Sequence, residues 1–104
     1  MNLPKSKLKE DFLNWLDKQE LAPYKQMFDD IPEFVQVSYV KKYLREQQCI
    51  DIEILTVKNN LAYCYKAWSD GKLIANGAES TYELADLFSI MAVFADIILS
   101  HEKN

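Results

Sequence analysis

The sequence contains few of the residues that catalytic and metal sites use most. Its 104 residues include two cysteines, two glycines and one histidine. Neither cysteine belongs to a Cys-x-x-Cys pair, and the glycines form no phosphate-binding pattern. His101 lies near the end of the sequence, and no nucleophile, base or further ligand is suggested beside it. We therefore expect a protein that is not an enzyme and holds no cofactor and no metal.

Arginine is almost absent, because Arg45 is the only one among twelve Lys+Arg residues. Sixteen Asp+Glu residues outweigh these cations and give a formal net charge of −4. Proteins that bind nucleic acids need clustered cations and favour arginine for its planar fork. This balance makes nucleic acid an unlikely partner, although a local basic patch remains open.

Long hydrophobic runs are missing as well. The most apolar segment, residues 84–99, is interrupted by Asp86, Ser89 and Asp96. It is also shorter than the ~20 residues of a typical membrane-spanning helix. Residues 1–5 lack the apolar run of a secretory signal. We expect a cytoplasmic protein that makes no membrane contact, and two free, mostly buried thiols at Cys49 and Cys64.

Hydrophobic residues are abundant, at 49% of the chain, with 12% aromatic. Such a composition excludes a disordered tail or linker, and the length fits one compact domain. We predict a single α+β domain over residues 1–104, with an N-terminal helical segment (1–31) and an αβββα core (32–104).

The N-terminal segment predicts two helices. Ser6 is placed to cap a first helix that runs to about Glu20, and Pro23 to open a short second one. Apolar residues recur at helical spacing in both. The predicted stripes are Leu8, Phe12, Trp15 and Leu16, then Tyr24, Met27, Phe28 and Ile31.

Residues 33–48 favour a third helix. Its inward residues would be Phe34, Val37, Val40 and Leu44. Residues 34–40 also alternate like a strand, so that both readings stay open there. The good helix formers of residues 41–48 favour the helix.

Three strands follow, over residues 50–57, 61–68 and 72–77. Two-residue turns at Asn59-Asn60 and Asp70-Gly71 would connect them and fix their register. The expected pairs are Thr56–Tyr63, Ile54–Tyr65, Glu53–Lys66, Trp68–Leu73 and Ala67–Ile74. One face then carries Ile52, Ile54, Tyr63, Tyr65, Ala67 and Ile74, and the other carries Leu55, Val57, Cys64, Trp68, Leu73 and Ala75.

A last helix is capped by Ser80 or Thr81 and ends near His101. Asp86, Ser89, Asp96 and Ser100 share one narrow face of its helical wheel, with Val93 among them. The remaining arc spans roughly 240° and is apolar, far wider than the ~100° stripe of an ordinary surface helix. The N-terminal helices could cover part of this arc, or another chain could.

From about Glu33 onward, the αβββα order resembles a double-stranded-RNA-binding domain. The closest likeness is the third strand, its glycine-containing connection and the start of the last helix, residues 70–80. In that family, lysines in the first turn of the last helix contact RNA phosphates. Here the corresponding residues are Thr81, Tyr82 and Glu83, so that the resemblance implies the fold and no RNA-binding residue.

The surplus of apolar surface predicts a small module that binds another protein, as an adaptor, inhibitor or regulator and as a homodimer. We expect the contact at Leu55, Val57, Trp68 and Leu73 on the sheet. The alternative is a nucleic-acid-binding module that uses Lys41, Lys42 and Arg45 together with Tyr43 as a stacking ring.

Overall fold

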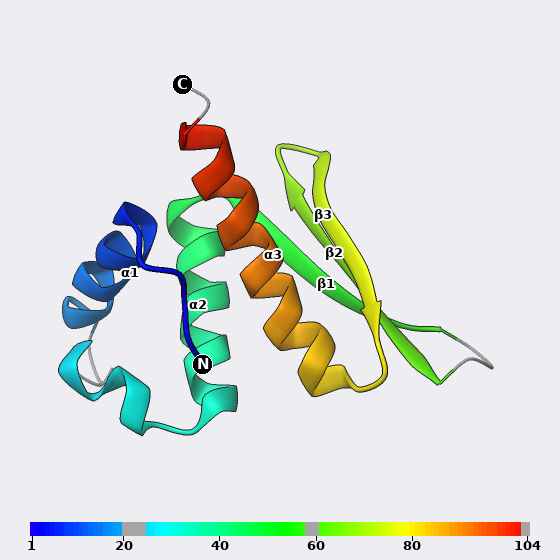
Figure 1. The fold of residues 1–104 in the computed structure, drawn as a ribbon, viewed down its shortest axis with the longest axis horizontal. Helices are drawn as coiled ribbons and strands as arrows, with labels where there is room; N and C mark the ends of the chain where they lie inside the picture. The colour runs from blue at the N-terminus through cyan, green and yellow to red at the C-terminus, as the bar shows by residue number, and fades with distance from the viewer. Residues whose placement is uncertain (20–24, 58–60, 103–104) are drawn as a thin grey trace.

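The computed structural model describes residues 1–19, 25–57 and 61–102 and shows an α+β fold (Figure 1). Three helices, one 3-10 helix and a three-stranded antiparallel sheet make up these residues. In chain order the elements are α1 (Lys7–Asp17), η1 (Lys25–Asp30), α2 (Glu33–Gln47), β1 (Ile50–Val57), β2 (Ala62–Ser69), β3 (Lys72–Glu79) and α3 (Tyr82–Glu102). This order is compatible with an αβββα arrangement that follows an N-terminal helical segment.

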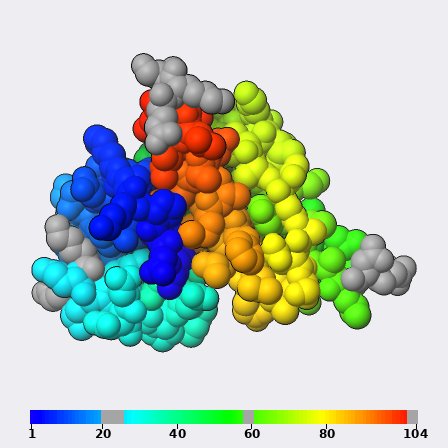
Figure 2. Space-filling model, viewed as in Figure 1, coloured from blue at the N-terminus to red at the C-terminus, as the bar shows by residue number. Residues whose placement is uncertain are grey.

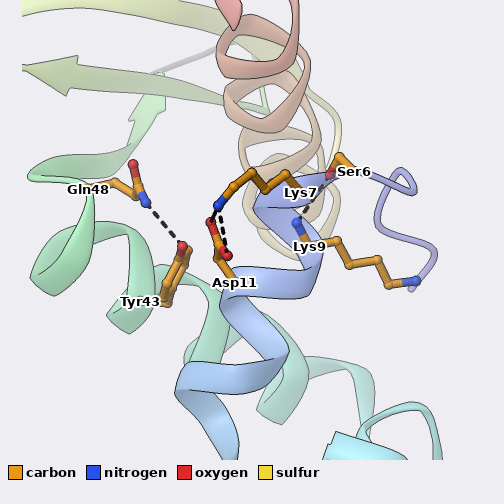
Figure 3. Close-up of polar contacts among 6 residues, drawn as sticks. All are labelled: Ser6, Lys7, Lys9, Asp11, Tyr43 and Gln48. Carbon is orange, nitrogen blue, oxygen red and sulfur yellow. Dashed lines mark hydrogen bonds and ion pairs between the residues drawn. The ribbon is translucent and has the colours of Figure 1, made fainter.

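Ser6 caps α1 as predicted. Its side-chain oxygen accepts a hydrogen bond from the backbone N–H of Lys9 at 3.1 Å (Figure 3). The helix ends at Asp17, earlier than the predicted Glu20, which lies outside the described residues together with Pro23 and Tyr24.

Two apolar residues predicted to point inward are exposed. Met27 and Phe28 are neighbours in η1, which winds more tightly than an α-helix. Phe28 is buried in the core, whereas Met27 is exposed. Phe34 is 73% exposed at the start of α2. The buried arc of α2 is set instead by Val37, Val40 and Leu44, and Phe34 lies about 60° beyond Val37 on the helical wheel. The helical reading of residues 34–40 is confirmed.

The register of the first hairpin is confirmed in every predicted pair, from Thr56–Tyr63 to Glu53–Lys66. The predicted Asn59-Asn60 turn itself lies outside the described residues. The second turn has the expected backbone, with positive φ at Asp70 and Gly71, and it pairs Trp68 with Leu73.

The predicted pair Ala67–Ile74 is wrong, because β3 contains a bulge at Ile74 and Ala67 pairs with Ala75. A bulge inserts one extra residue and turns the rest of the strand over. Ala75 therefore joins the face that carries Ala67, and Asn76 points to the other face, opposite Lys66. Without the bulge, polar Asn76 would lie on the helix side of the sheet.

The helices and the sheet lie side by side in Figure 1, with α3 between α2 and the sheet. The chain is accordingly flat, with extents of 42 × 35 × 21 Å. One core runs through all of these elements. Its fully buried residues include Phe12, Leu16, Val40, Leu44, Ala67, Ile90, Val93 and Phe94.

Both cysteines are free, as predicted, but their burial differs from the prediction. Cys49 is exposed, with a φ of 55°, in the link between α2 and β1. Cys64 is only half-buried, because its side of the sheet carries no helix.

Candidate protein-binding surfaces

The polar face of α3 points into the protein along the first half of the helix, from Asp86 to Val93. Ser89 and Val93 are fully buried. Asp86 accepts a hydrogen bond at 2.8 Å from Lys41 Nζ of α2, and both side chains of this ion pair are largely shielded from solvent. The Ser89 hydroxyl donates to the backbone carbonyl of Asp86 at 2.7 Å. These contacts direct the polar face of α3 against α2.

As a consequence, the outer face of α3 is apolar from Leu84 to Leu99. We call this surface the α3 stripe; it consists of Leu84, Phe88, Met91, Ala92, Ala95, Ile98 and Leu99. On the helical wheel the stripe spans about 120°, and Asp86 lies opposite its centre. The exposed fraction is 36% for Leu84, 43% for Phe88 and 55% for Leu99, and Ala95 is exposed too.

The N-terminal segment lies beside Ile98 at one end of the α3 stripe and leaves most of the stripe uncovered. Phe12, Leu16 and Phe28 share the core with Ile90, Val93 and Phe94 of α3, on the inner side of the helix. In Figure 2, α3 reaches the molecular surface between the N-terminal segment and β3. The N-terminal segment therefore covers part of the apolar arc of α3, as the sequence allowed. Much of the α3 stripe remains exposed.

The four residues predicted as a contact on the sheet do share one face, through the pairs Trp68–Leu73 and Leu55–Cys64. Leu55 and Leu73 are exposed, while Val57 and Trp68 are half-buried.

They form two patches rather than one, because a polar row of Glu53, Lys66 and Asn76 crosses the sheet between them. The indole N–H of Trp68 donates to Glu53 Oε1 at 3.0 Å across this boundary.

The residues of the nucleic-acid alternative are largely engaged within the protein. Lys41 forms an ion pair with Asp86, and Nζ of Lys42 lies 3.9 Å from Oε2 of Glu46. Tyr43 is 3% exposed and packs on the rings of Phe12 and Trp15.

Burial raises the pKa of the Tyr43 phenol above its usual value, although the Gln48 side chain donates a hydrogen bond to its oxygen (Figure 3). Of the four residues, only Lys42 and Arg45 are exposed.

One helix, over Tyr82–His101, is long and apolar enough to cross a membrane by length and composition. The predicted ends of this helix, after Ser80 or Thr81 and near His101, agree with its bounds, and it is longer than the apolar segment 84–99 that was judged too short for a membrane span. Within the protein, α3 packs on α2 and on all three strands. Over residues 1–19, 25–57 and 61–102, no cluster of three His, Cys, Asp or Glu side chains could hold a metal ion.

Comparison with protein-family models, curated proteins and solved structures finds no match to this chain. The exposed surfaces themselves are therefore the basis for a functional proposal.

Sequence reasoning missed two exposed aromatic residues, Phe34 and Tyr82. Both line a shallow cleft between the first turns of α2 and α3, together with Val37 and Asp86. The signal in the sequence was weak, because Phe34 fits the inward stripe of its helix within 60°.

The Lys41–Asp86 ion pair is expected to hold α3 in its orientation. Lys41→Glu would place two carboxylates together at a shielded site, and we expect it to lower the free energy of unfolding by about 2 kcal/mol. The swap Lys41→Glu/Asp86→Lys should regain most of that loss. Lys42→Glu, beside exposed Glu46, is the matched control and should cost less than about 1 kcal/mol. Urea unfolding measures all three, and an equal loss for Lys41→Glu and Lys42→Glu would contradict the assignment.

Proposed function

We propose that this protein is a small non-enzymatic module that works in the cytoplasm by binding another protein chain. The observation that supports this best is the α3 stripe, which is apolar from Leu84 to Leu99 and leaves Leu84, Phe88, Ala95 and Leu99 exposed. Soluble monomers rarely expose so continuous an apolar surface unless it binds something. The α3 stripe is the proposed main contact.

A second proposed contact is the end of the sheet that carries Trp68 and Leu73. Tryptophan is among the residues most enriched in binding hot spots. The remaining two residues, Leu55 and Val57, form a smaller patch beyond the polar row. A module with two separate apolar surfaces can hold two chains at once, as an adaptor does.

The nucleic-acid alternative has less support. The proposed resemblance to double-stranded-RNA-binding domains concerns the order of elements only, and an acid, Glu83, occupies the first turn of α3. Binding through α2 would predict an affinity that falls steeply with salt. An RNA or DNA gel shift at low salt that Arg45→Glu abolishes would favour this alternative.

Affinity purification from the native cell tests the proposed function. The full chain is compared with Phe88→Glu, Trp68→Ala and, as a control, exposed Gln47→Glu, and retained proteins are identified by mass spectrometry. Sedimentation of the same four proteins reports self-association. We expect at least one chain, a partner or a second copy, that the wild type and Gln47→Glu bind and a stripe or tryptophan variant loses. The proposal would be refuted if the wild type is a monomer and if Phe88→Glu and Trp68→Ala both retain the same proteins as the wild type.

A further inference from the structure

Apart from Ile98, the residues of the α3 stripe are arranged symmetrically about a midpoint that lies between Met91 and Ala92. Leu84 and Leu99 are equally far from this point along the helix, and so are Phe88 and Ala95. A two-fold axis through the midpoint would therefore superpose the stripe on a reversed copy of itself. Such self-complementarity is what an isologous dimer interface requires.

The sizes of the side chains are complementary under the same operation. An antiparallel pair centred on the midpoint places Phe88 of one copy against Ala95 of the other, and Met91 against Ala92. These two central contacts each join a large residue to a small one, which lets two helices pack closely without voids. A parallel pair would place Phe88 against Phe88 and Ala95 against Ala95.

The surface area of the chain leaves room for such an interface. Its accessible surface is 6951 Å². A monomeric protein of 12.1 kDa is expected to expose about 6000 Å². The surplus of roughly 900 Å² is spread over the whole chain, and it is comparable to the ~800 Å² that each partner buries in an interface of standard size.

From this symmetry, size complementarity and area we propose that the occupant of the α3 stripe is a second copy of this chain. The two α3 helices cross antiparallel near Met91 and Ala92, and the interface is two-fold symmetric. This inference rests on the proposed function and specifies its partner.

Sedimentation equilibrium at 1–100 μM is the first test. The wild type is expected at twice 12.1 kDa. Phe88→Glu should raise the dissociation constant by about 100-fold or more, because each copy would bury a charge in the interface. Leu61→Glu, at a side chain that is 88% exposed and belongs to neither proposed contact, is the matched control and should leave the dissociation constant unchanged. Leu55→Glu tests the sheet instead, and dissociation by Leu55→Glu alone would place the interface there and overturn the proposal.

Single cysteines test the direction of the helices, in a Cys49→Ser/Cys64→Ala background. Ala92→Cys lies next to the axis and should oxidise to a disulfide-linked dimer. Two copies of Leu84→Cys should not link, because their Cα atoms would be about 22 Å apart along the helix. A mixture of Leu84→Cys and Leu99→Cys should link. Linkage of Leu84→Cys to itself, without linkage of the mixture, would indicate a parallel pair and refute this geometry.

A size swap tests the proposed contact between Phe88 and Ala95. Phe88→Ala alone should weaken the dimer by about tenfold or more. Phe88→Ala/Ala95→Phe restores a large residue opposite a small one in both copies, and it should regain most of the affinity. An Ala95→Phe change that adds a further loss in the Phe88→Ala background would contradict the contact.

A monomer at 100 μM would overturn the homodimer, and two further measurements then separate it from the proposed function. If Phe88→Glu still loses a different protein in the affinity purification, the module binds that protein through the stripe. If instead the monomer floats with anionic phospholipid vesicles and Phe88→Glu does not, the stripe contacts a membrane and both proposals are wrong.

Discussion

Replacing Phe12 by alanine is expected to lower the free energy of unfolding by about 3–5 kcal/mol, the largest effect of any single substitution considered. The ring is fully buried on α1. It meets the rings of Phe28 and Tyr43 edge to face, with centroids 5.2 and 5.4 Å away, and stacks on Trp15 at 6.1 Å. The substitution therefore removes both apolar burial and three aromatic contacts, and leaves a cavity where α1, η1 and α2 meet.

The matched control is Phe34→Ala, the same chemical change on a ring that is 73% exposed. It should change stability by less than about 0.5 kcal/mol. Urea unfolding followed by far-UV circular dichroism, at one fixed protein concentration, measures both variants. Equal losses for Phe12→Ala and Phe34→Ala would mean that α1 is not part of the core.

Local patterns predict the strands and most of the helices. The register of β1 and β2 could be predicted by assuming a two-residue turn, since that turn length leaves one way to pair Ile54 with Tyr65. The α2 helix follows from Val37, Val40 and Leu44, which recur at helical spacing. Each of these features depends on residues that are close together in the sequence.

The features that sequence reasoning missed depend on contacts between distant residues. The bulge at Ile74 cannot be read from the turn, because its benefit comes from Asn76 pointing away from α3. Tyr43 has a polar hydroxyl and lies between Lys42 and Arg45 in the sequence, so it was expected on the surface. It is buried because α1 brings Phe12 and Trp15 against it, from about thirty residues away.

The candidate site was predicted only in part. The helical wheel of α3 indicates more apolar surface than a three-stranded sheet can cover. It does not indicate which part stays exposed, because that depends on Lys41, which is 45 residues from its partner Asp86. A polar face normally predicts the solvent side of a helix. Here the ion pair directs that face inward and leaves the α3 stripe outside.

The second large effect is expected at Gly77 in β3. Gly77 pairs with Tyr65 across the sheet, and a Cβ atom added at Gly77 would overlap the phenol ring. Tyr65 is 9% exposed. The pKa of its phenol is raised, mainly because the ring is buried and also because the negative charge of the Glu79 carboxylate is nearby. Since the buried ring has little room to move, Gly77→Ala should lower the free energy of unfolding by about 2–3 kcal/mol.

Gly77→Ala has two effects, the overlap of its Cβ with the Tyr65 ring and the restriction of the backbone. A double-mutant cycle with Tyr65→Ala separates them. In that background, Gly77→Ala should cost less than about 1 kcal/mol, because the ring it would overlap is gone. The control is Gly71→Ala, where no atom is near but the φ of +76° disfavours any side chain. It should cost about 1 kcal/mol whether or not Tyr65 is present. If Tyr65→Ala fails to relieve Gly77→Ala, the ring does not lie over Gly77, and the register set by the β3 bulge is wrong.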